Sequence, residues 1–395
     1  MPSELPAGWI KRRLTDVVRF PAGQVDPREL PYREQPLLAP DHVESGTGRV
    51  ISLRTAQSQG ATSGKYIVTP GDVVLSKIRP ALRKVALAEF TGTCSADMYP
   101  LRSCPDVLPE FLQAVLLSDH FSLFAGSLSG RTGIPKVNRA DLASYEMLIP
   151  PKSEQLKIVD VYGSLTEVER STEVTIEKLQ ALRAAFLEQL LSVGHRPLSE
   201  VIVSGPQNGL YKPAESYGQT GTPIVRINSF SGGPSDLTRD LLRVSASPDE
   251  VRRYQISVGD LLVNRVNTQE LVGRSTVVSR LVEPTVFESN IMRCKIAIGE
   301  VNPRFLEAWM STSAVKAHFL RRAKPAVSQA SINRSDVYSC PIPKLGIDEQ
   351  NSFLLRLDAL SEEVVEERVK LEKLHRLKQG LVDDLLSGRA ISSTQ

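Results

Sequence analysis

This sequence has few cysteines, no long apolar run and no cluster of residues with metal-binding spacing. Its 395 residues include four cysteines, none with CxxC spacing, which is typical of free thiols in a reducing cytoplasm. No apolar run approaches the ~18 residues of a membrane span, and charges interrupt the apolar stretch near the N-terminus, which argues against a secretory signal. We therefore expect a cytoplasmic protein without membrane contact.

Signatures of catalysis and of cofactor binding are also missing. The five histidines are scattered and form no HExxH motif. Neither a glycine-rich dinucleotide loop nor the Asn/Asp-Pro-Pro-Tyr/Phe tetrapeptide of amino-methyltransferases occurs. Residues 60–66 resemble a phosphate loop, but they are one residue short between the glycines and have Tyr66 where Ser or Thr must reach magnesium. We expect no catalytic residue, no cofactor and no metal. A nuclease or methyltransferase with a diverged motif is the alternative.

What the sequence does contain is an internal repeat. Residues 150–192 recur at 343–387, and an offset of 195 places Glu154-Gln155 on Glu349-Gln350 and continues without a gap to Ser192 and Ser387. A gapless match of this length indicates a duplicated unit. Four shorter segments recur in the same order, with offsets that drift from 184 to 195: Leu14–Val18 with Leu198–Ile202, Pro70–Val74 with Val258–Leu262, Pro109–Leu112 with Pro303–Leu306, and Val137–Leu142 with Ile332–Val337.

The segments outside the long repeats have mixed secondary-structure signals. Short β-rich runs at 66–68, 72–75 and 85–87 are separated by Gly and Pro, which predicts strands divided by turns. Residues 109–124 predict a helix with one apolar face and a second N-terminal cap at Ser118-Asp119. The predicted fold class is α+β, with two mixed α/β domains arranged as an internal repeat and separated by two long helices.

Apolar residues recur every three or four positions in both long repeats, which predicts the two helices. About 40 residues at a rise of 1.5 Å give roughly 60 Å of helix. Ser153 and Asp348 are the expected N-caps, and Gly194 and Gly388 are the expected C-terminal stops. Gly163 is a candidate kink. We expect an antiparallel coiled coil; the alternative is that each helix packs only on its own globular domain.

These signals divide the chain into five segments. The first globular domain is expected at 1–150, the first long helix at 151–194 and the second globular domain at 195–342. The second long helix is expected at 343–388, and a short tail follows at 389–395.

Charge is unevenly distributed along the chain, whose net charge is +3. Residues 152–192 carry 7 acids and 5 bases, and residues 349–387 carry 9 acids and 6 bases, so the remainder carries +8. A mildly positive globular part permits nucleic-acid binding without requiring it.

Polar, basic loops recur in both halves at matching places. Residues 76–84 and 264–275 form one pair, and residues 130–139 and 324–334 form another. Arg and Asn read base edges, whereas Lys and Ser contact phosphates. For any single residue a solvated surface or a turn-stabilising Asn is the simpler interpretation, but recurrence in both halves favours DNA contact for the set. The candidate DNA-binding residues are Lys77, Arg79, Arg83, Lys84, Arg131, Lys136, Asn138, Arg139, Asn264, Arg265, Asn267, Arg274, Lys324, Gln329, Asn333 and Arg334.

Several of these segments resemble the specificity subunit of type I restriction-modification systems. The resemblance rests on Leu5–Trp9, on Gly259–Asn267, and on Ile149–Gln155 with Ile342–Gln350, which open the two long helices. It covers essentially the whole chain, including the duplication. It implies two target-recognition domains that bind double-stranded DNA. It also implies paired helices that bind methyltransferase subunits, through which restriction subunits join the complex.

The same resemblance implies that methylation and cleavage belong to partner chains and that this chain is a non-catalytic subunit. Roughly 60 Å of helix lies between one and two turns of B-DNA at ~34 Å each, which predicts a bipartite target with an unread spacer. Residues 76–80 depart from the Asn-Arg-Val-Asn-Thr run at 264–268, so the two half-sites should differ. A specificity subunit of a related type II enzyme (IIB/IIG-like) and a coiled-coil scaffold that does not bind DNA are the alternatives.

Overall fold

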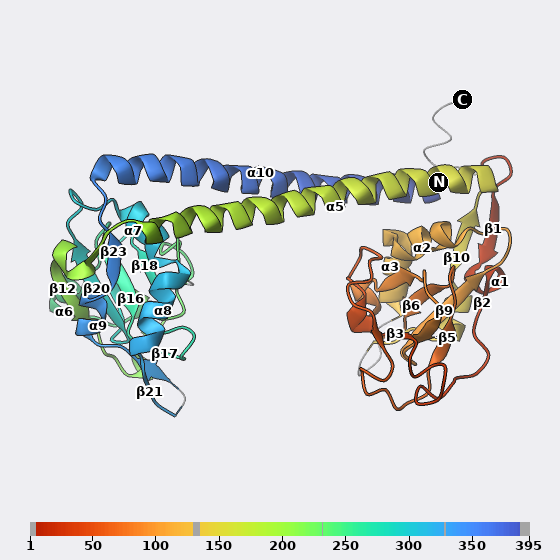
Figure 1. Ribbon diagram of the computed structural model, residues 1–395, viewed down its shortest axis with the longest axis horizontal. Coiled ribbons are helices and arrows are strands. Elements are labelled where there is room, and N and C mark those ends of the chain that lie inside the picture. Colours follow the sequence, from red (N-terminus) through yellow and green to blue (C-terminus); the bar gives the residue numbers. More distant parts are fainter. Residues whose placement is uncertain (1–4, 129–134, 231, 328, 388–395) are drawn as a thin grey trace. The chain divides into compact units, whose positions relative to one another are not determined.

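The computed structural model describes residues 5–128, 135–230, 232–327 and 329–387 (Figure 1). The chain divides into two compact units, of which the first combines two segments that are distant in sequence and the second is one continuous segment. Unit 1 comprises Met1–Thr175 with Glu367–Gln395, and unit 2 comprises Ile176–Glu366. Each unit therefore holds a globular domain and part of each long helix, α5 (Lys152–Glu188) and α10 (Ile347–Leu386).

The globular domain of unit 1 is built on ten short strands. They are β1 (Ile10–Arg13), β2 (Val18–Arg19), β3 (Pro36–Leu38), β4 (Arg54–Thr55), β5 (Tyr66–Val68), β6 (Val73–Ser76), β7 (Val85–Leu87), β8 (Gly92–Cys94), β9 (Met98–Ser103) and β10 (Glu146–Ile149). They form two four-stranded sheets, β2-β9-β6-β7 and β4-β3-β8-β5, and the pair β1-β10. The strands expected at 66–68, 72–75 and 85–87 correspond to β5, β6 and β7, so these predictions are confirmed.

Short helices accompany the strands of unit 1. They are α1 (Leu14–Val17), α2 (Pro109–Leu117), α3 (Asp119–Ser127) and α4 (Arg139–Ala143), with 3-10 turns η1 (Pro40–His42) and η2 (Pro80–Leu82). α2 lies against β6 and β7, and its Phe111 and Leu112 are fully buried. Full burial of each such side chain stabilises the fold by roughly 1.5–3 kcal/mol. The Ser118 hydroxyl accepts a hydrogen bond from the Phe121 amide, which confirms the predicted restart.

Unit 2 repeats this plan with additional strands. They are β11 (His195–Pro197), β12 (Ile202–Asn208), β13 (Tyr217–Gly218), β14 (Thr222–Val225), β15 (Arg243–Val244), β16 (Leu261–Asn264), β17 (Val266–Asn267), β18 (Ser275–Val277), β19 (Val286–Phe287), β20 (Ile291–Ile296), β21 (Lys324–Pro325), β22 (Ala330–Ser331) and β23 (Pro341–Pro343). Its helical segments are η3 (Gln189–Ser192), η4 (Leu198–Val201), η5 (Ala214–Ser216), α6 (Pro248–Tyr254), α7 (Pro303–Met310), α8 (Ser313–Arg322) and α9 (Arg334–Tyr338).

The two globular domains have the same sheet order. The sheet β12-β20-β16-β18 corresponds to β2-β9-β6-β7, and the pair β11-β23 corresponds to β1-β10. The turn before the central strand is also repeated: Gly71 and Gly259 both have φ of +90°, a value that favours glycine. The carboxylates of Asp72 and Asp260 accept hydrogen bonds from the backbone amides three residues earlier, each at 2.8 Å. The predicted fold class and duplication are confirmed.

The predicted helix caps need correction. α5 begins at Lys152 and α10 at Ile347, so Ser153 and Asp348 lie inside the first turns. The carbonyl of Pro151 accepts from the Glu154 and Gln155 amides. The Glu349 carboxylate accepts from the Gly346 amide at 2.8 Å, so the preceding Pro and Gly occupy the cap positions.

The C-terminal stops and the kink have different outcomes. α5 tightens into η3 at Gln189, and Gly194 follows this turn, where its carbonyl accepts from the Lys344 amide. Gly388 and the tail at 389–395 lie outside the described residues. α5 is a single helix through Gly163, the expected kink position.

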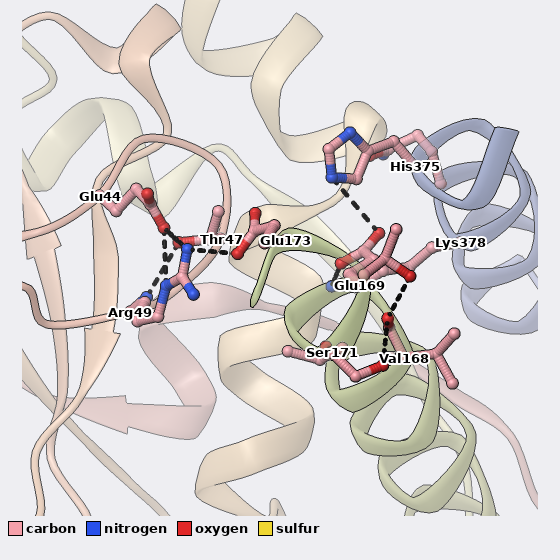
Figure 2. Close-up of polar contacts among 12 residues, drawn as sticks. Glu44, Thr47, Arg49, Val168, Glu169, Ser171, Glu173, His375 and Lys378 are labelled. Atoms are coloured by element: carbon pink, nitrogen blue, oxygen red, sulfur yellow. Dashed lines mark hydrogen bonds and ion pairs between the residues drawn. The ribbon is translucent and has the colours of Figure 1, made fainter. Parts of the chain in front are cut away.

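The long helices pair in an antiparallel manner within each unit. In unit 1, Lys378 of α10 donates to the Glu169 carboxylate of α5 at 2.8 Å, and the His375 ring nitrogen lies 3.8 Å from the same carboxylate (Figure 2). In unit 2, the rings of Phe186 and Phe353 stack with centroids 4.4 Å apart. The predicted pairing is confirmed, although each helix also enters the core of a globular domain. In the described part of the chain no helix meets the length and apolar content of a membrane span.

Candidate nucleic-acid interface

The two loops predicted in unit 1 lie side by side. The Arg79 amide donates to the Pro135 carbonyl, and the Val137 amide donates to the Lys77 carbonyl, both at 2.9 Å. Ile78 and Lys136 form an antiparallel bridge between these bonds. Residues 76–80 and 135–139 therefore form one continuous surface.

The corresponding loops of unit 2 are joined in the same way. β17 pairs with β22, where Val266 lies opposite Ser331, and β22 pairs with β21 to complete a three-stranded ribbon. The Ile332 amide also donates to the Arg265 carbonyl at 3.0 Å. The repeat thus preserves the pairing of the two basic loops, although the sequences of the loops differ.

A cluster of cations and aromatic rings forms the loop surface of unit 1. The Lys77 ammonium lies 4.7 Å from the centroid of Tyr99 and 5.8 Å from that of Tyr66. The Arg139 guanidinium carbon lies 4.9 Å from the ring of Phe20 and 5.6 Å from that of Tyr99. Cation–π contacts of this kind orient both cations. Burial raises the pKa of Tyr99, and the nearby Arg139 opposes this shift.

The surface of unit 2 has a different composition. The ribbon carries exposed Lys324 and Gln329, and Val327 between them is fully exposed. Arg321 and Arg322 end α8 immediately before the ribbon.

Sequence reasoning missed Phe20, Tyr66 and Tyr99, because these rings come from three strands or loops that only folding brings together. It also missed Arg321 and Arg322, although two adjacent arginines before Lys324 were a visible signal.

Most of the predicted cations lack a carboxylate partner. Within the described ranges, Arg83 is the candidate that forms an ion pair, with Asp119, and it also donates to Ser122 and Gln379. Lys84 donates to the Pro40 carbonyl at 2.6 Å. These two side chains hold the fold of unit 1 together. The candidates with no carboxylate of a described residue within 4.0 Å are Lys77, Arg79, Lys84, Lys136, Arg139, Arg265, Arg274, Lys324 and Arg334.

The four predicted asparagines have structural roles. The Asn138 and Asn333 side chains cap α4 and α9, and each forms a reciprocal capping box with the aspartate three residues later. Asn264 is fully buried and donates to the Ile227 carbonyl at 3.2 Å, so its side chain is not at the surface. The Asn267 side chain is also buried, and it accepts from the Thr268 amide. Arg131 lies outside the described residues.

The arrangement suits a polyanion better than a small-molecule reaction. Cations without a carboxylate partner on adjoining loops can contact phosphates, and in unit 1 aromatic rings restrict the conformations of Lys77 and Arg139. In the described part of the chain no group of three or more His, Cys, Asp or Glu side chains could hold a metal ion.

Parts of the chain match known proteins. Residues 6–182 match a family model described as type I restriction modification DNA specificity domain. The type I restriction enzyme EcoDI specificity subunit of Escherichia coli is 38% identical over 191 residues, which are 47% of this chain and 42% of that relative. A putative MjaX specificity subunit of Methanocaldococcus jannaschii is 23% identical over 181 residues, also 42% of its length. The chain thus aligns with under half of the length of these relatives.

Solved structures extend the similarity to the whole chain. A chain from a type I R-M system, studied for its complex assembly and conformational transition, superposes with a TM-score of 0.70 at 21% identity, covering 98% of this chain and 100% of that one. The HsdS subunit from Thermoanaerobacter tengcongensis superposes with a TM-score of 0.52, also at 21% identity, with 98% of each chain covered. At this identity the structures show the shared fold. Together with the family match, they confirm the predicted resemblance to type I specificity subunits.

Proposed function

We propose that this chain, whose residues 6–182 carry a type I restriction modification DNA specificity domain, is the DNA-recognition subunit of a type I restriction-modification complex. Each globular domain would read one half of a bipartite, asymmetric target through its joined loops. The observation that carries this proposal is the repeated pairing of two basic loops, at Ile78 with Lys136 and at Val266 with Ser331.

The chemistry of the loops supports DNA as the ligand. Cations without carboxylate partners are free to neutralise phosphates and release counterions, which supplies most of the sequence-independent affinity. Arg139 and Arg265 carry the forked donors that recognise guanine edges in the major groove. Because the first unit orients its cations on rings and the second uses a ribbon, the two half-sites should have different sequences.

The long helices support a docking role for partner subunits. Val174 and Val369 occupy equivalent repeat positions and are 39% and 44% exposed, and the equivalent Leu182 and Leu377 are 53% and 58% exposed. Single exposed apolar residues are common on protein surfaces, but their recurrence at equivalent positions of both helices favours a repeated protein contact. We propose that methyltransferase subunits bind these faces, and that restriction subunits join through them in the cytoplasm.

The proposed division of labour leaves catalysis to the partners. The relatives named above are specificity subunits of restriction enzymes, and this chain would supply target recognition alone. The continuous α5 and α10, of 37 and 40 residues, would set the length of the unread spacer.

Selection of random DNA duplexes by the purified full-length chain tests this function. The expected result is one enriched sequence with two different half-sites and an unread spacer, bound without cleavage or methylation when magnesium, ATP and S-adenosylmethionine are present. Turnover by the chain alone would overturn the non-catalytic role. Recovery of no enriched sequence, with or without methyltransferase subunits, would favour a coiled-coil scaffold.

A further inference from the structure

A fully buried glutamine lies in the first turn of α5. The Gln155 side-chain nitrogen donates to the Asp106 carbonyl at 2.8 Å and to the Pro150 carbonyl at 2.9 Å. Its side-chain oxygen accepts from the Leu108 amide at 2.9 Å. The amide group therefore bonds the start of the long helix to the segment that immediately precedes α2.

The same arrangement recurs at the start of α10. Gln350, also fully buried, donates to the Glu300 carbonyl at 3.0 Å and to the Leu345 carbonyl at 2.9 Å. Its side-chain oxygen accepts from the Asn302 amide at 2.8 Å. Each partner atom is the repeat equivalent of one around Gln155, so two separate domains use one device, which we call the glutamine clamp.

Hydrogen bonding makes the clamp a specific restraint. Both amide hydrogens and one acceptor site of each glutamine are used, and the group is planar. Three bonds to two chain segments define the position and the rotation of the helix start relative to α2 or α7. Apolar contacts alone are less directional, because hydrophobic burial has no preferred geometry. Removal of the amide would take this partner from three backbone groups, which is costly wherever water cannot replace it.

Further contacts hold each helix along its length. Ile158 of α5 and Leu354 of α10 are buried in the cores of their units. In unit 1, Arg49 pairs with Glu173 of α5 at 2.9 Å (Figure 2), and in unit 2, Arg304 pairs with Asp358 of α10 at 2.7 Å. These ion pairs are partly exposed, so each stabilises the attachment less than a buried restraint does.

We propose that Gln155 and Gln350 are positioning residues that lock each recognition domain onto its long helix and thereby determine how strictly the spacer length is read. This inference rests on the proposed function, in which the helices connect two half-site readers. The glutamines contact no DNA. They act through the orientation of the domain that carries the loops, so their loss changes the tolerated spacing and leaves the bases of each half-site unchanged.

Competitive binding to duplexes with fixed half-sites and spacers altered by one or two base pairs tests the clamp. The half-sites come from the selection with the unaltered chain. The unaltered full-length chain should prefer one spacer length. Gln155→Ala and Gln350→Ala should each reduce that preference by roughly tenfold, as expected when hydrogen-bonded restraints of ordinary strength are lost. Gln180→Ala, which changes an exposed glutamine of α5, is the matched control and should leave the preference unchanged.

Two further measurements separate positioning from stability. Gln155→Met keeps most of the side-chain volume and replaces the alanine variant if that one fails to fold. Amide exchange at Leu108 should increase in folded Gln155 variants while the core of α2 stays protected. Folded variants with unchanged spacer preference would overturn the clamp, as would reduced affinity equal for all spacers. Failure of the unaltered chain to select any bipartite sequence would instead overturn the proposed function.

Discussion

The two recognition units use one scaffold for two different surfaces. In unit 1 the paired loops hold Lys77 and Arg139 against a set of aromatic rings, whereas in unit 2 the paired loops form a three-stranded ribbon. The sheet order, the glycine turn, the asparagine caps and the glutamine clamp are the same in both. Elements that maintain the fold and the helix attachment are therefore shared, and the loops that face a ligand have diverged.

The helix pair shows a second difference between the units. Unit 1 buries the ion pair between Glu169 and Lys378. The repeat places Val364 where Glu169 stands and Arg183 where Lys378 stands, and Arg183 donates to the Ser361 hydroxyl at 3.1 Å. A single buried charged pair thus distinguishes one part of the helix pair from the other.

The largest expected effect comes from breaking that ion pair. Lys378→Leu leaves the Glu169 carboxylate buried without its ammonium partner and should lower the stability of unit 1 by about 3–5 kcal/mol. Urea unfolding followed by Trp9 fluorescence in a Trp309→Phe background reports on unit 1, because the chain has one tryptophan in each unit.

The matched variant in unit 2 should have a smaller effect. Arg183→Leu removes a hydrogen bond to a neutral hydroxyl, and Trp309 fluorescence in a Trp9→Phe background reports it. The double variant Glu169→Val/Lys378→Leu should recover most of the stability. Equal losses for Lys378→Leu and Arg183→Leu would contradict the difference between the units.

The next largest effect, on DNA recognition, is expected from the basic loops. Arg139→Ala should relax one half-site and Arg265→Ala the other, each by about 1–3 kcal/mol for a lost bidentate contact. Selection of targets by each variant provides the measurement. Salt titration separates the alternative role, because loss of a phosphate contact weakens all sequences alike and reduces the salt dependence. Relaxation of both half-sites by one variant would refute the assignment of one half-site to each unit.

A smaller effect, equal in both units, is expected for the asparagine caps. Asn138→Ala and Asn333→Ala should each lower the stability of their own unit by about 1 kcal/mol through loss of a helix N-cap. Asn138→Asp and Asn333→Asp keep the capping oxygen and are the controls. The selected half-site sequences should not change. A changed base preference with unchanged stability would instead indicate that these asparagines contact DNA bases.

The smallest effect is the pH dependence that His318 gives to the stability of unit 2. Burial lowers the pKa of His318 from its ordinary 6.5, although a hydrogen bond to the Asp336 carbonyl opposes the shift. The folded state therefore binds fewer protons than the unfolded chain near this pH. Neutral His318 therefore makes its full contribution to the stability of unit 2 above about pH 6.5, and this contribution decreases as the pH falls below that value.

Urea unfolding of unit 2 between pH 7.5 and 5.5 measures this dependence through Trp309. His318→Gln should remove part of it and leave the pH response of unit 1 unaltered. Stability of the unaltered unit 2 that rises on acidification would contradict the burial argument.

Local patterns in the sequence were sufficient for much of the scaffold. The turn at Gly71, the restart at Ser118 and the long helices all depend on nearby residues, and the offset of 195 identified the duplication. The helix caps were misplaced by two residues, because Pro151 and Gly346 occupy the cap positions in place of Ser153 and Asp348. The recurrence of the basic loops in both halves indicated a shared role, but it did not predict that the two loops of each unit are joined by backbone hydrogen bonds.

Contacts between distant strands could not be predicted in the same way. Phe20 and Tyr99 reach Arg139 only after β2 and β9 have paired, so nothing near Arg139 in sequence indicates an aromatic partner. Asn264 resembled a surface reader because it begins a polar run, but it is the last residue of a buried strand. The sequence shows that the glutamines of the clamp recur in the repeat. Their role became apparent only when the structure placed residues 106–108 and 300–302 next to them.

The central claim is that two different surfaces on one repeated scaffold read two different half-sites. Methylome sequencing of a host that carries the methyltransferase subunits, with and without this chain, tests it most directly. We predict one modified sequence with unlike halves and a fixed spacer, present only with the chain, and altered in one half alone by Arg139→Ala. A methylome that is the same without the chain, or a modified sequence with no spacer, would contradict the claim.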